Sequence, residues 1–260
     1  MLPSKKHLTA RAYFPRGLVQ PGKGPEKGYR FSADALLLGC FLEPAPGDRL
    51  LDLGTGSGAV ALTMFCSFPD LFAVGIDIQP EYVAAVNANA AKLGFGRNFT
   101  ALQADILAPN LSPYLSPSLP LEPGSFDLAL ANPPYRQRDQ GRLPPDSARL
   151  LALFEQADTL AAFCRYAAKA LKTGGRFGII FPARRRDDLL VLLSGAGLAP
   201  RRILRIHAHS DSPARVILVE AVKGSAYQKA SIDEQALILH AKHEQHFSVD
   251  ALAFCPFLAR

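Results

Sequence analysis

The sequence lacks any long apolar run, and this absence excludes a transmembrane helix. None of its apolar stretches approaches the roughly 18 residues that a helix needs to cross a bilayer. The N-terminus up to Pro15 is basic and contains no apolar segment, which argues against a secretory signal. The charged share of 20% and the hydrophobic share of 48% are ordinary for a globular protein. We therefore expect a cytoplasmic protein with one sizeable core.

Cysteine is scarce, and its spacing excludes several kinds of site. The 4 cysteines lie far apart and form no C-x-x-C pair, so we expect reduced thiols rather than a disulfide framework or a zinc site. Near the C-terminus, His240, His243 and His246 follow one another at three-residue intervals. Because no cysteine or acidic array completes a ligand set around them, we predict no metal site and assign these histidines no role.

The positive charge is concentrated at the N-terminus. The net charge is +6, and residues 1–30 contain basic side chains against the single acid Glu26, so that this segment carries an excess equal to that of the whole chain. A basic segment of this kind fits a polyanionic partner such as a nucleic acid. The alternative is a solvated basic tail with no partner.

Apolar strands and helices alternate through the middle of the sequence. We predict strands at 49–54, 73–78, 99–104, 126–131 and 175–181, and helices at 58–67, 80–94, 148–172 and 184–195. Such alternation is typical of a doubly wound α/β fold with a parallel sheet. A short connection joins the later apolar runs 203–207 and 215–220, so we expect them to form an antiparallel hairpin.

Three parts of unequal size follow from this pattern. Residues 1–46 form a basic N-terminal extension that ends in a leucine-rich helix capped by Ser32. Residues 47–223 form the α/β domain. Residues 224–260 form a C-terminal tail to which the sequence assigns no role.

The most informative motif is Asn132-Pro133-Pro134-Tyr135, which follows the apolar strand 126–131. Open α/β sheets bind their ligands at the carboxyl ends of strands. There, Asn132 offers an amide oxygen, Pro133 a carbonyl without a competing N–H group, and Tyr135 a flat face for stacking. Two acceptors and a ring form a receptor for a planar amino group, so we predict that these residues are catalytic.

A glycine-rich turn follows the first strand. Asp52 precedes Gly54, Gly56 and Gly58, which form a G-x-G-x-G pattern rather than the G-x-G-x-x-G of dinucleotide-binding proteins. Glycine lets the backbone approach a ligand closely. The next strand ends at Asp77, where an acid suits a ribose diol.

In these two motifs the chain resembles the class I S-adenosylmethionine (SAM) methyltransferases that act on a planar amino nitrogen. The resemblance implies a Rossmann-like α/β fold with a mostly parallel seven-stranded sheet and a late antiparallel hairpin. It also implies SAM as the cofactor and an acid at Asp105 that meets the adenine of SAM. The cofactor residues expected in this region are Asp52, Gly54, Gly56, Gly58, Asp77, Ile78, Asp105, Ile106 and Asn132.

The segment before the first strand narrows the resemblance. Arg30, Ser32 and Asp34 precede a leucine-rich helix, and this pattern is similar to the N-terminal motif of the bacterial valine-tRNA adenine-N6 methyltransferases. The resemblance implies that these three residues also line the SAM pocket. Many members of that family have threonine where this chain has Ala33. The similarity extends over about residues 16–223.

Arginines follow both strand ends that face the expected substrate. We predict that they contact the phosphates and bases of RNA near a nucleotide that leaves its stack. The residues concerned are Arg136, Arg138, Arg142, Arg184 and Arg185. The predicted reaction is therefore SAM-dependent methylation of the N6 of an unpaired adenine in the anticodon-loop region of tRNA.

Other functions share some of these features. A ribosomal RNA base methyltransferase and a protein-glutamine N5-methyltransferase both act on planar amino groups. From a different class, an NAD(P)-dependent oxidoreductase would share the fold but leave Asn132 and Tyr135 unexplained. A catalytically silent RNA-binding module would share the basic charge.

Overall fold

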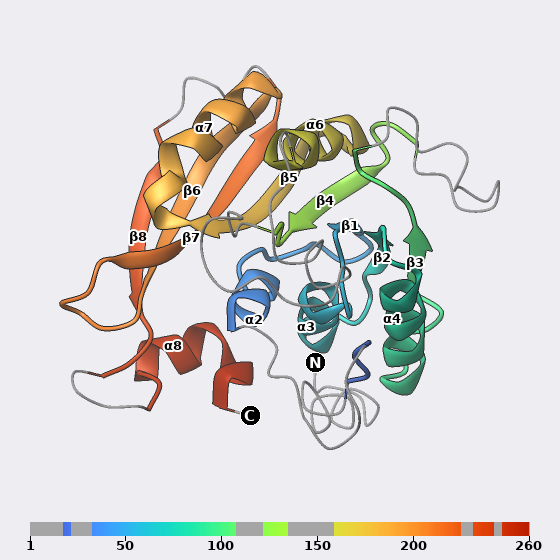
Figure 1. Cartoon of the computed structure of the whole chain (residues 1–260), viewed down its shortest axis with the longest axis horizontal. Coiled ribbons are helices and arrows are strands. Elements are labelled where there is room, and N and C mark those ends of the chain that lie inside the picture. The colour runs from blue at the N-terminus through green and yellow to red at the C-terminus, as the bar shows by residue number, and fades with distance from the viewer. Residues whose placement is uncertain are drawn as a thin grey trace, which may run out of the picture.

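The computed structural model has a single mixed sheet at its centre (Figure 1). The structure describes residues 18–21, 33–107, 122–134, 159–224, 231–241 and 246–259. Within them, eight strands follow the order β3-β2-β1-β4-β5-β7-β6-β8. Their bounds are β1 (Arg49–Leu53), β2 (Phe72–Asp77), β3 (Phe99–Gln103), β4 (Phe126–Ala131), β5 (Leu171–Pro182), β6 (Leu198–His207), β7 (Ala214–Lys223) and β8 (Asp233–Ile238).

The first five strands of the chain are parallel, and the hairpin that follows them is antiparallel. β1 pairs with β2 and β4, β2 with β3, and β4 with β5, all in the parallel sense. β7 runs antiparallel to both β5 and β6. The predicted Rossmann-like fold and its late hairpin are therefore confirmed.

The predicted number of strands was wrong by one. Strand β8, which falls in the part of the sequence assigned to the tail, pairs in parallel with β6 from Arg202↔Asp233 to His207↔Ile238. All of its residues except Leu237 are exposed, so its side chains show no apolar alternation. Main-chain hydrogen bonding at the sheet edge holds this strand, and such bonding leaves no signal in the sequence.

Helices cover both faces of the sheet (Figure 1). One face carries α2 (Ala33–Gly39), α3 (Ala59–Ser67), α4 (Pro80–Lys92), α8 (Val249–Phe254) and the short helix η4 (Pro256–Ala259). The other carries α6 (Thr159–Ala170) and α7 (Arg186–Gly195), the latter preceded by η2 (Ala183–Arg185). Successive strand residues enter opposite cores, as Leu50 and Leu51 do, because side chains alternate along a strand. In the described part of the chain, no helix is long and apolar enough to cross a membrane.

One predicted boundary between a helix and a strand shifts in the structure. The helix expected at 148–172 is observed as α6, and residues 148–158 lie outside the described residues. The strand expected at 175–181 already begins at Leu171, directly after α6. Leu171 pairs with Phe126 of β4 before the register shifts, and Gly174 has a φ of 80°. The strand thus continues through a bulge. Its glycines are typical of a loop, which is why the sequence predicted a later start for the strand.

The close packing of α2 on α3 yields a stability prediction. A methyl group at Gly39 would lie 2.5 Å from Cβ of Thr63 and 2.7 Å from the carbonyl oxygen of Val60. Gly39→Ala must therefore push the two helices apart, at a cost of about 1–3 kcal/mol, and lower the Tm by roughly 2–10 °C. Differential scanning calorimetry measures this change. Gly195→Ala is the control, since no atom lies within 4 Å of its added methyl group; an equal Tm for both variants would contradict the prediction.

Candidate active site

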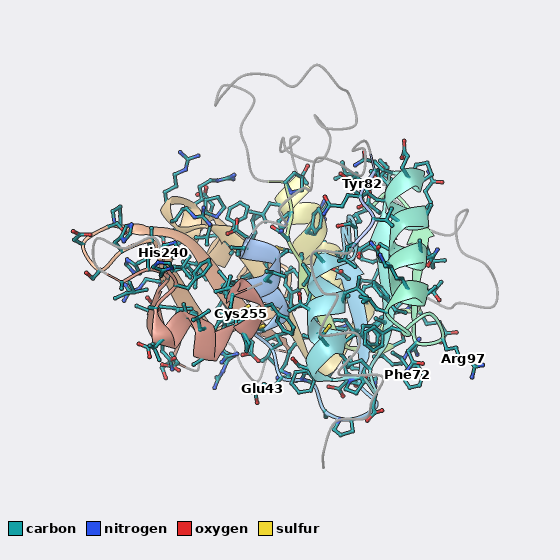
Figure 2. All side chains as sticks on the ribbon, turned by 90° about the horizontal axis from the view of Figure 1, so that it is seen from below. Glu43, Phe72, Tyr82, Arg97, His240 and Cys255 are labelled. Atoms are coloured by element: carbon teal, nitrogen blue, oxygen red, sulfur yellow. The ribbon has the colours of Figure 1, made fainter. Side chains whose placement is uncertain are left out.

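The candidate site lies where the parallel strands end. Because β1 to β5 run in the same direction, their carboxyl ends meet at one edge of the sheet. In Figure 2, Tyr82 in the first turn of α4 marks this edge, and Phe72 at the start of β2 marks the opposite one. The edge therefore brings together the glycine-rich turn after β1, Asp77 at the end of β2, and Asn132 just beyond β4.

The glycine-rich turn presents its backbone to open space at Gly56. Gly54, Gly56 and Gly58 all adopt positive φ angles, of 66°, 53° and 82°. Two backbone hydrogen bonds of 2.9 Å brace the turn: the Thr55 N–H donates to Ile76 O, and the Gly58 N–H donates to Thr55 O. A methyl group at Gly56 would meet no atom within 4 Å. A ligand can therefore approach the main chain at Gly56, where a side chain would strain the backbone and would fill the space that the ligand needs.

Asp52 is a buried acid with unused hydrogen-bonding capacity. Asp52 is 1% exposed, and its Oδ2 accepts a hydrogen bond of 2.8 Å from the Thr55 hydroxyl. Its Oδ1 is buried and has no hydrogen-bond partner among the described residues. Burial raises the pKa of the Asp52 carboxyl to about 7; the Thr55 hydroxyl and the Ala61 N–H oppose the shift, and the nearby charge of Asp77 adds to it. A cationic or N–H donor from a ligand would satisfy the remaining oxygen.

Asp77 connects the second strand to the glycine-rich turn. Its Oδ2 accepts a hydrogen bond of 2.9 Å from the Gly56 N–H, and its Oδ1 accepts one of 3.0 Å from the Gln79 N–H. Burial raises the pKa of this carboxyl as well. The N-cap of α4 is Gln79, so Asp77 supports the start of that helix from outside it. Each carboxylate oxygen has a second lone pair, which leaves Asp77 able to accept hydrogen bonds from a diol.

Beside Asp77, the ends of β2 and β3 offer apolar surface together with an acid. Ile78 is 43% exposed, and its carbonyl accepts a hydrogen bond of 3.2 Å from the Gln103 amide. Asp105 accepts a hydrogen bond of 2.8 Å from the Leu107 N–H, as a turn residue does. Ile106 packs partly on the core. An exposed apolar side chain near a half-buried acid suits a flat heteroaromatic ring with an amino group.

The Asn-Pro-Pro segment follows β4 next to the glycine-rich turn. Leu53 pairs with Ala131, so Asn132 comes directly beyond the strand that neighbours Gly54. Pro133 is buried, and Asn132 is half-buried. The remaining predicted residues here and upstream of α2 lie outside the described residues: Arg30, Ser32, Tyr135, Arg136, Arg138 and Arg142.

The other predicted residues contact the protein itself. Asp34 on α2 is 3% exposed, and its Oδ1 accepts a hydrogen bond of 2.6 Å from the guanidinium of Arg215 on β7. Arg184 and Arg185 follow β5, next to the end of β4, so they lie at the same sheet edge. The Arg185 guanidinium lies 4.9 Å from the centre of the Phe181 ring and pairs with Asp188 at 3.1 Å.

Sequence reasoning missed Thr55 and Arg215. Thr55 lies within the glycine-rich turn, next to the predicted residues, and a hydroxyl three residues after Asp52 was a usable signal. Arg215 is 181 residues from Asp34, and its local sequence contains no sign of this partner.

Several known methyltransferases are similar to this chain in sequence. The sequence profile of one family, described as "Methyltransferase domain", matches residues 44–192. A tRNA1(Val) (adenine(37)-N6)-methyltransferase of Porphyromonas gingivalis is 27% identical over 215 residues, which cover 81% of each chain. A release factor glutamine methyltransferase of Rhodospirillum rubrum is 34% identical over 176 residues, which cover 65% of this chain but only 49% of that protein.

A solved structure supports the same fold. The crystal structure of a predicted O-methyltransferase from Agrobacterium tumefaciens matches with a TM-score of 0.68. The two chains are 20% identical, and the match covers 86% of this chain and 96% of that one. At this identity the similarity concerns the fold alone.

The raised pKa of Asp52 predicts a pH-dependent stability for the ligand-free protein. Between pH 5 and the folded-state pKa of about 7, the folded protein holds a proton that the unfolded chain has lost, so the free energy of unfolding falls as pH rises. We expect wild type to lose about 3 kcal/mol more than Asp52→Asn between pH 5 and pH 8. Urea denaturation at both pH values measures the difference. Parallel losses in the two proteins would refute it.

Proposed function

This chain belongs to the methyltransferase domain family, and on that premise we propose that it methylates the exocyclic N6 of an unpaired adenine in the anticodon-loop region of tRNA. The observation that carries the proposal is the placement of Asn132 and Pro133 next to the glycine-rich turn. The named tRNA adenine-N6 methyltransferases that match over four-fifths of the chain support the choice of acceptor. This reaction uses tRNA and SAM, so we assign it to the cytoplasm.

The residues at the sheet edge fit SAM as the cofactor. SAM supplies a methyl group on a positively charged sulfur, where a nucleophile can accept it. The Asp52 Oδ1, which has no hydrogen-bond partner among the described residues, would suit the ammonium of the methionine part, and the open space at Gly56 would let that part approach the backbone of the turn. Asp77 would accept hydrogen bonds from the ribose hydroxyls. Ile78, Asp105 and Ile106 would contact the adenine.

Asn132 and Pro133 would perform the positioning that the reaction needs. The lone pair of an exocyclic amino nitrogen is delocalised into the ring, which makes it a poor nucleophile. If the Asn132 amide oxygen and the Pro133 carbonyl each accept one N–H, they hold the nitrogen and favour a more pyramidal geometry. Positioning of this kind can supply a large part of a rate enhancement. No strong base is needed if the proton leaves after the transfer, and Tyr135 would stack on the base.

The substrate side of the site would be basic. Arg184 and Arg185 lie beyond β5, beside the end of β4. We assign them to RNA together with Arg136, Arg138 and Arg142 of the segment after Tyr135. An adenine in an anticodon loop is already largely unpaired, so moving it into the site costs less than opening a duplex.

The alternative acceptors fit less well. A protein-glutamine methyltransferase would use the same planar amino chemistry, but the glutamine-specific relative matches this chain over only about half of its own length. Residues 1–30 carry a positive excess equal to that of the whole chain, which favours a polyanion. A nicotinamide-dependent oxidoreductase leaves the Asn-Pro-Pro-Tyr motif without a role. A ribosomal RNA base is the remaining competitor.

One experiment tests the reaction directly. The protein is incubated with radiolabelled SAM and with undermodified total tRNA, ribosomal RNA fragments or release factor, and the labelled product is then identified. We expect label in N6-methyladenosine from tRNA. Label only in ribosomal RNA or only in glutamine would replace the proposed acceptor. A protein that binds no SAM would overturn the proposed function altogether.

Two substitutions should separate catalysis from cofactor binding. Asn132→Ala removes an acceptor for the reacting amino group, so we expect kcat to fall about 10²–10³-fold while the Kd for SAM changes less than about twofold. Asp77→Asn removes the charged acceptor for the ribose, so it should raise the Kd for SAM about tenfold or more. Isothermal titration and single-turnover kinetics measure the two effects. An equal loss of SAM affinity in both variants would contradict this division of roles.

A further inference from the structure

The proposed function gives no role to a buried asparagine on α4. Asn89 is 0% exposed, although its neighbours Val86 and Ala90 on the same helix belong to the apolar core. An amide in such surroundings is costly unless its polar atoms are hydrogen-bonded. The partners of Asn89 therefore explain why the helix carries a polar side chain on its apolar face.

The Asn89 amide holds a segment from the beginning of the chain. Its Oδ1 accepts a hydrogen bond of 2.7 Å from the Val19 N–H, and its Nδ2 donates one of 3.0 Å to Val19 O. The side chain thus binds both main-chain groups of Val19, as a neighbouring strand would. The adjacent Leu18 packs against the core. The Asn89 amide and the packing of Leu18 therefore hold residues 18–21 against the fold.

The same amide also holds the glycine-rich turn. The Nδ2 of Asn89 donates a second hydrogen bond, of 3.0 Å, to the carbonyl oxygen of Ser57. Ser57 lies between Gly56 and Gly58, both of which adopt positive φ angles. Because glycine is conformationally permissive, a contact from outside the turn helps to fix the direction of the Ser57 carbonyl. With both N–H groups and the oxygen engaged, Val19 fixes the plane of the amide, and the amide in turn fixes the carbonyl of Ser57.

We propose that Asn89 is a positioning residue that makes the affinity for SAM depend on the docking of residues 18–21. The inference rests on the proposed role of the glycine-rich turn in holding SAM. When Val19 is docked, the amide keeps the turn in its ligand-ready conformation. When Val19 is released, the amide loses two of its three hydrogen bonds, and the Ser57 carbonyl is then held by an amide whose plane is no longer fixed. Residues 18–21 belong to the basic stretch 1–30, so the clamp joins the part of the chain suited to RNA with the cofactor turn.

Two variants break the clamp from opposite sides. Asn89→Ala removes all three hydrogen bonds, and we expect it to raise the Kd for SAM about tenfold or more. Val19→Pro removes the N–H that donates to Asn89 Oδ1 and leaves Asn89 itself unchanged. It should raise the Kd about three- to tenfold. The double variant should bind SAM no more weakly than Asn89→Ala alone, because both changes break one interaction.

The chain offers a matched control for each variant. Asn87 lies on the same helix, and its Oδ1 accepts a hydrogen bond of 3.0 Å from the Ala101 N–H, away from the glycine-rich turn. Asn87→Ala should therefore leave the Kd for SAM within about twofold of wild type. Val19→Ala keeps both main-chain groups and shortens a side chain that is 50% exposed, so it should also bind normally.

The measurements are the Kd for SAM by isothermal titration, the Tm, and kcat at saturating SAM, all on the full chain. A positioning role raises Kd and KM for SAM while kcat at saturation stays within about twofold. A merely structural role lowers the Tm and leaves the Kd of the folded protein unchanged, which would overturn the proposal. If Asn89→Ala fails to fold, Val19→Pro against Val19→Ala decides the question.

The proposal can fail without the proposed function. If wild type binds SAM and methylates tRNA, but Val19→Pro and Asn89→Ala bind SAM as tightly as their controls, only the clamp is refuted. If wild type does not bind SAM, the proposed function fails first. An additive loss of affinity in the double variant would show that Val19 and Asn89 act independently and would also overturn the coupling.

Discussion

Parallel pairing of the first five strands is the constraint on which the site depends. A parallel pair requires a crossover connection, so the chain must cover both faces of the sheet with helices and must make each strand-to-helix turn at the same edge. Strands buried on both faces have no room for polar side chains along their length. The polar groups therefore gather toward their ends. Among the described residues, the buried polar groups next to the glycine-rich turn are Asp52, Thr55, Ser57, Asp77 and, from α4, Asn89.

The two buried acids next to the glycine-rich turn make this region favourable for positive charge. Two acids with pKa values raised chiefly by burial lie at adjacent strand ends; the charge of Asp77 further disfavours the charged form of Asp52, and Glu81 does the same to Asp77. Burial of an acid without a cationic partner weakens the folded state near neutral pH, because the ionised form is poorly solvated. A positively charged ligand would relieve this cost. The same arrangement that lowers the stability of the empty protein thus favours a cationic cofactor over a neutral one.

The sequence predicts local backbone conformation, but it does not predict which distant residues contact one another. The glycine pattern after β1 and the prolines after β4 determine their own backbone conformation, so the turn and the strand end could be predicted from a few adjacent residues. Asp34 with Arg215, and Asn89 with Val19, are partners 181 and 70 residues apart, and neither member of a pair identifies the other. Asn89 lies on the apolar face of the helix predicted at 80–94, which is a usable signal of a buried contact but does not indicate the partner. Strand β8 lacked even that signal, since its exposed side chains follow no pattern.

Long-range contacts hold the N-terminal extension against the rest of the fold. α2 is held by Arg215 of β7 through Asp34, and Arg202 of β6 donates a hydrogen bond of 2.6 Å to Phe41 O, just beyond the end of α2. The Arg202 guanidinium also lies 4.3 Å from the centre of the Phe41 ring. The late hairpin therefore does more than complete the sheet: it fixes the helix that leads into β1. Asn89 of α4 holds the main chain of Val19, so the described parts of the N-terminal extension are tied to the rest of the fold at two separate points, at α2 by the late hairpin and at residues 18–21 by α4.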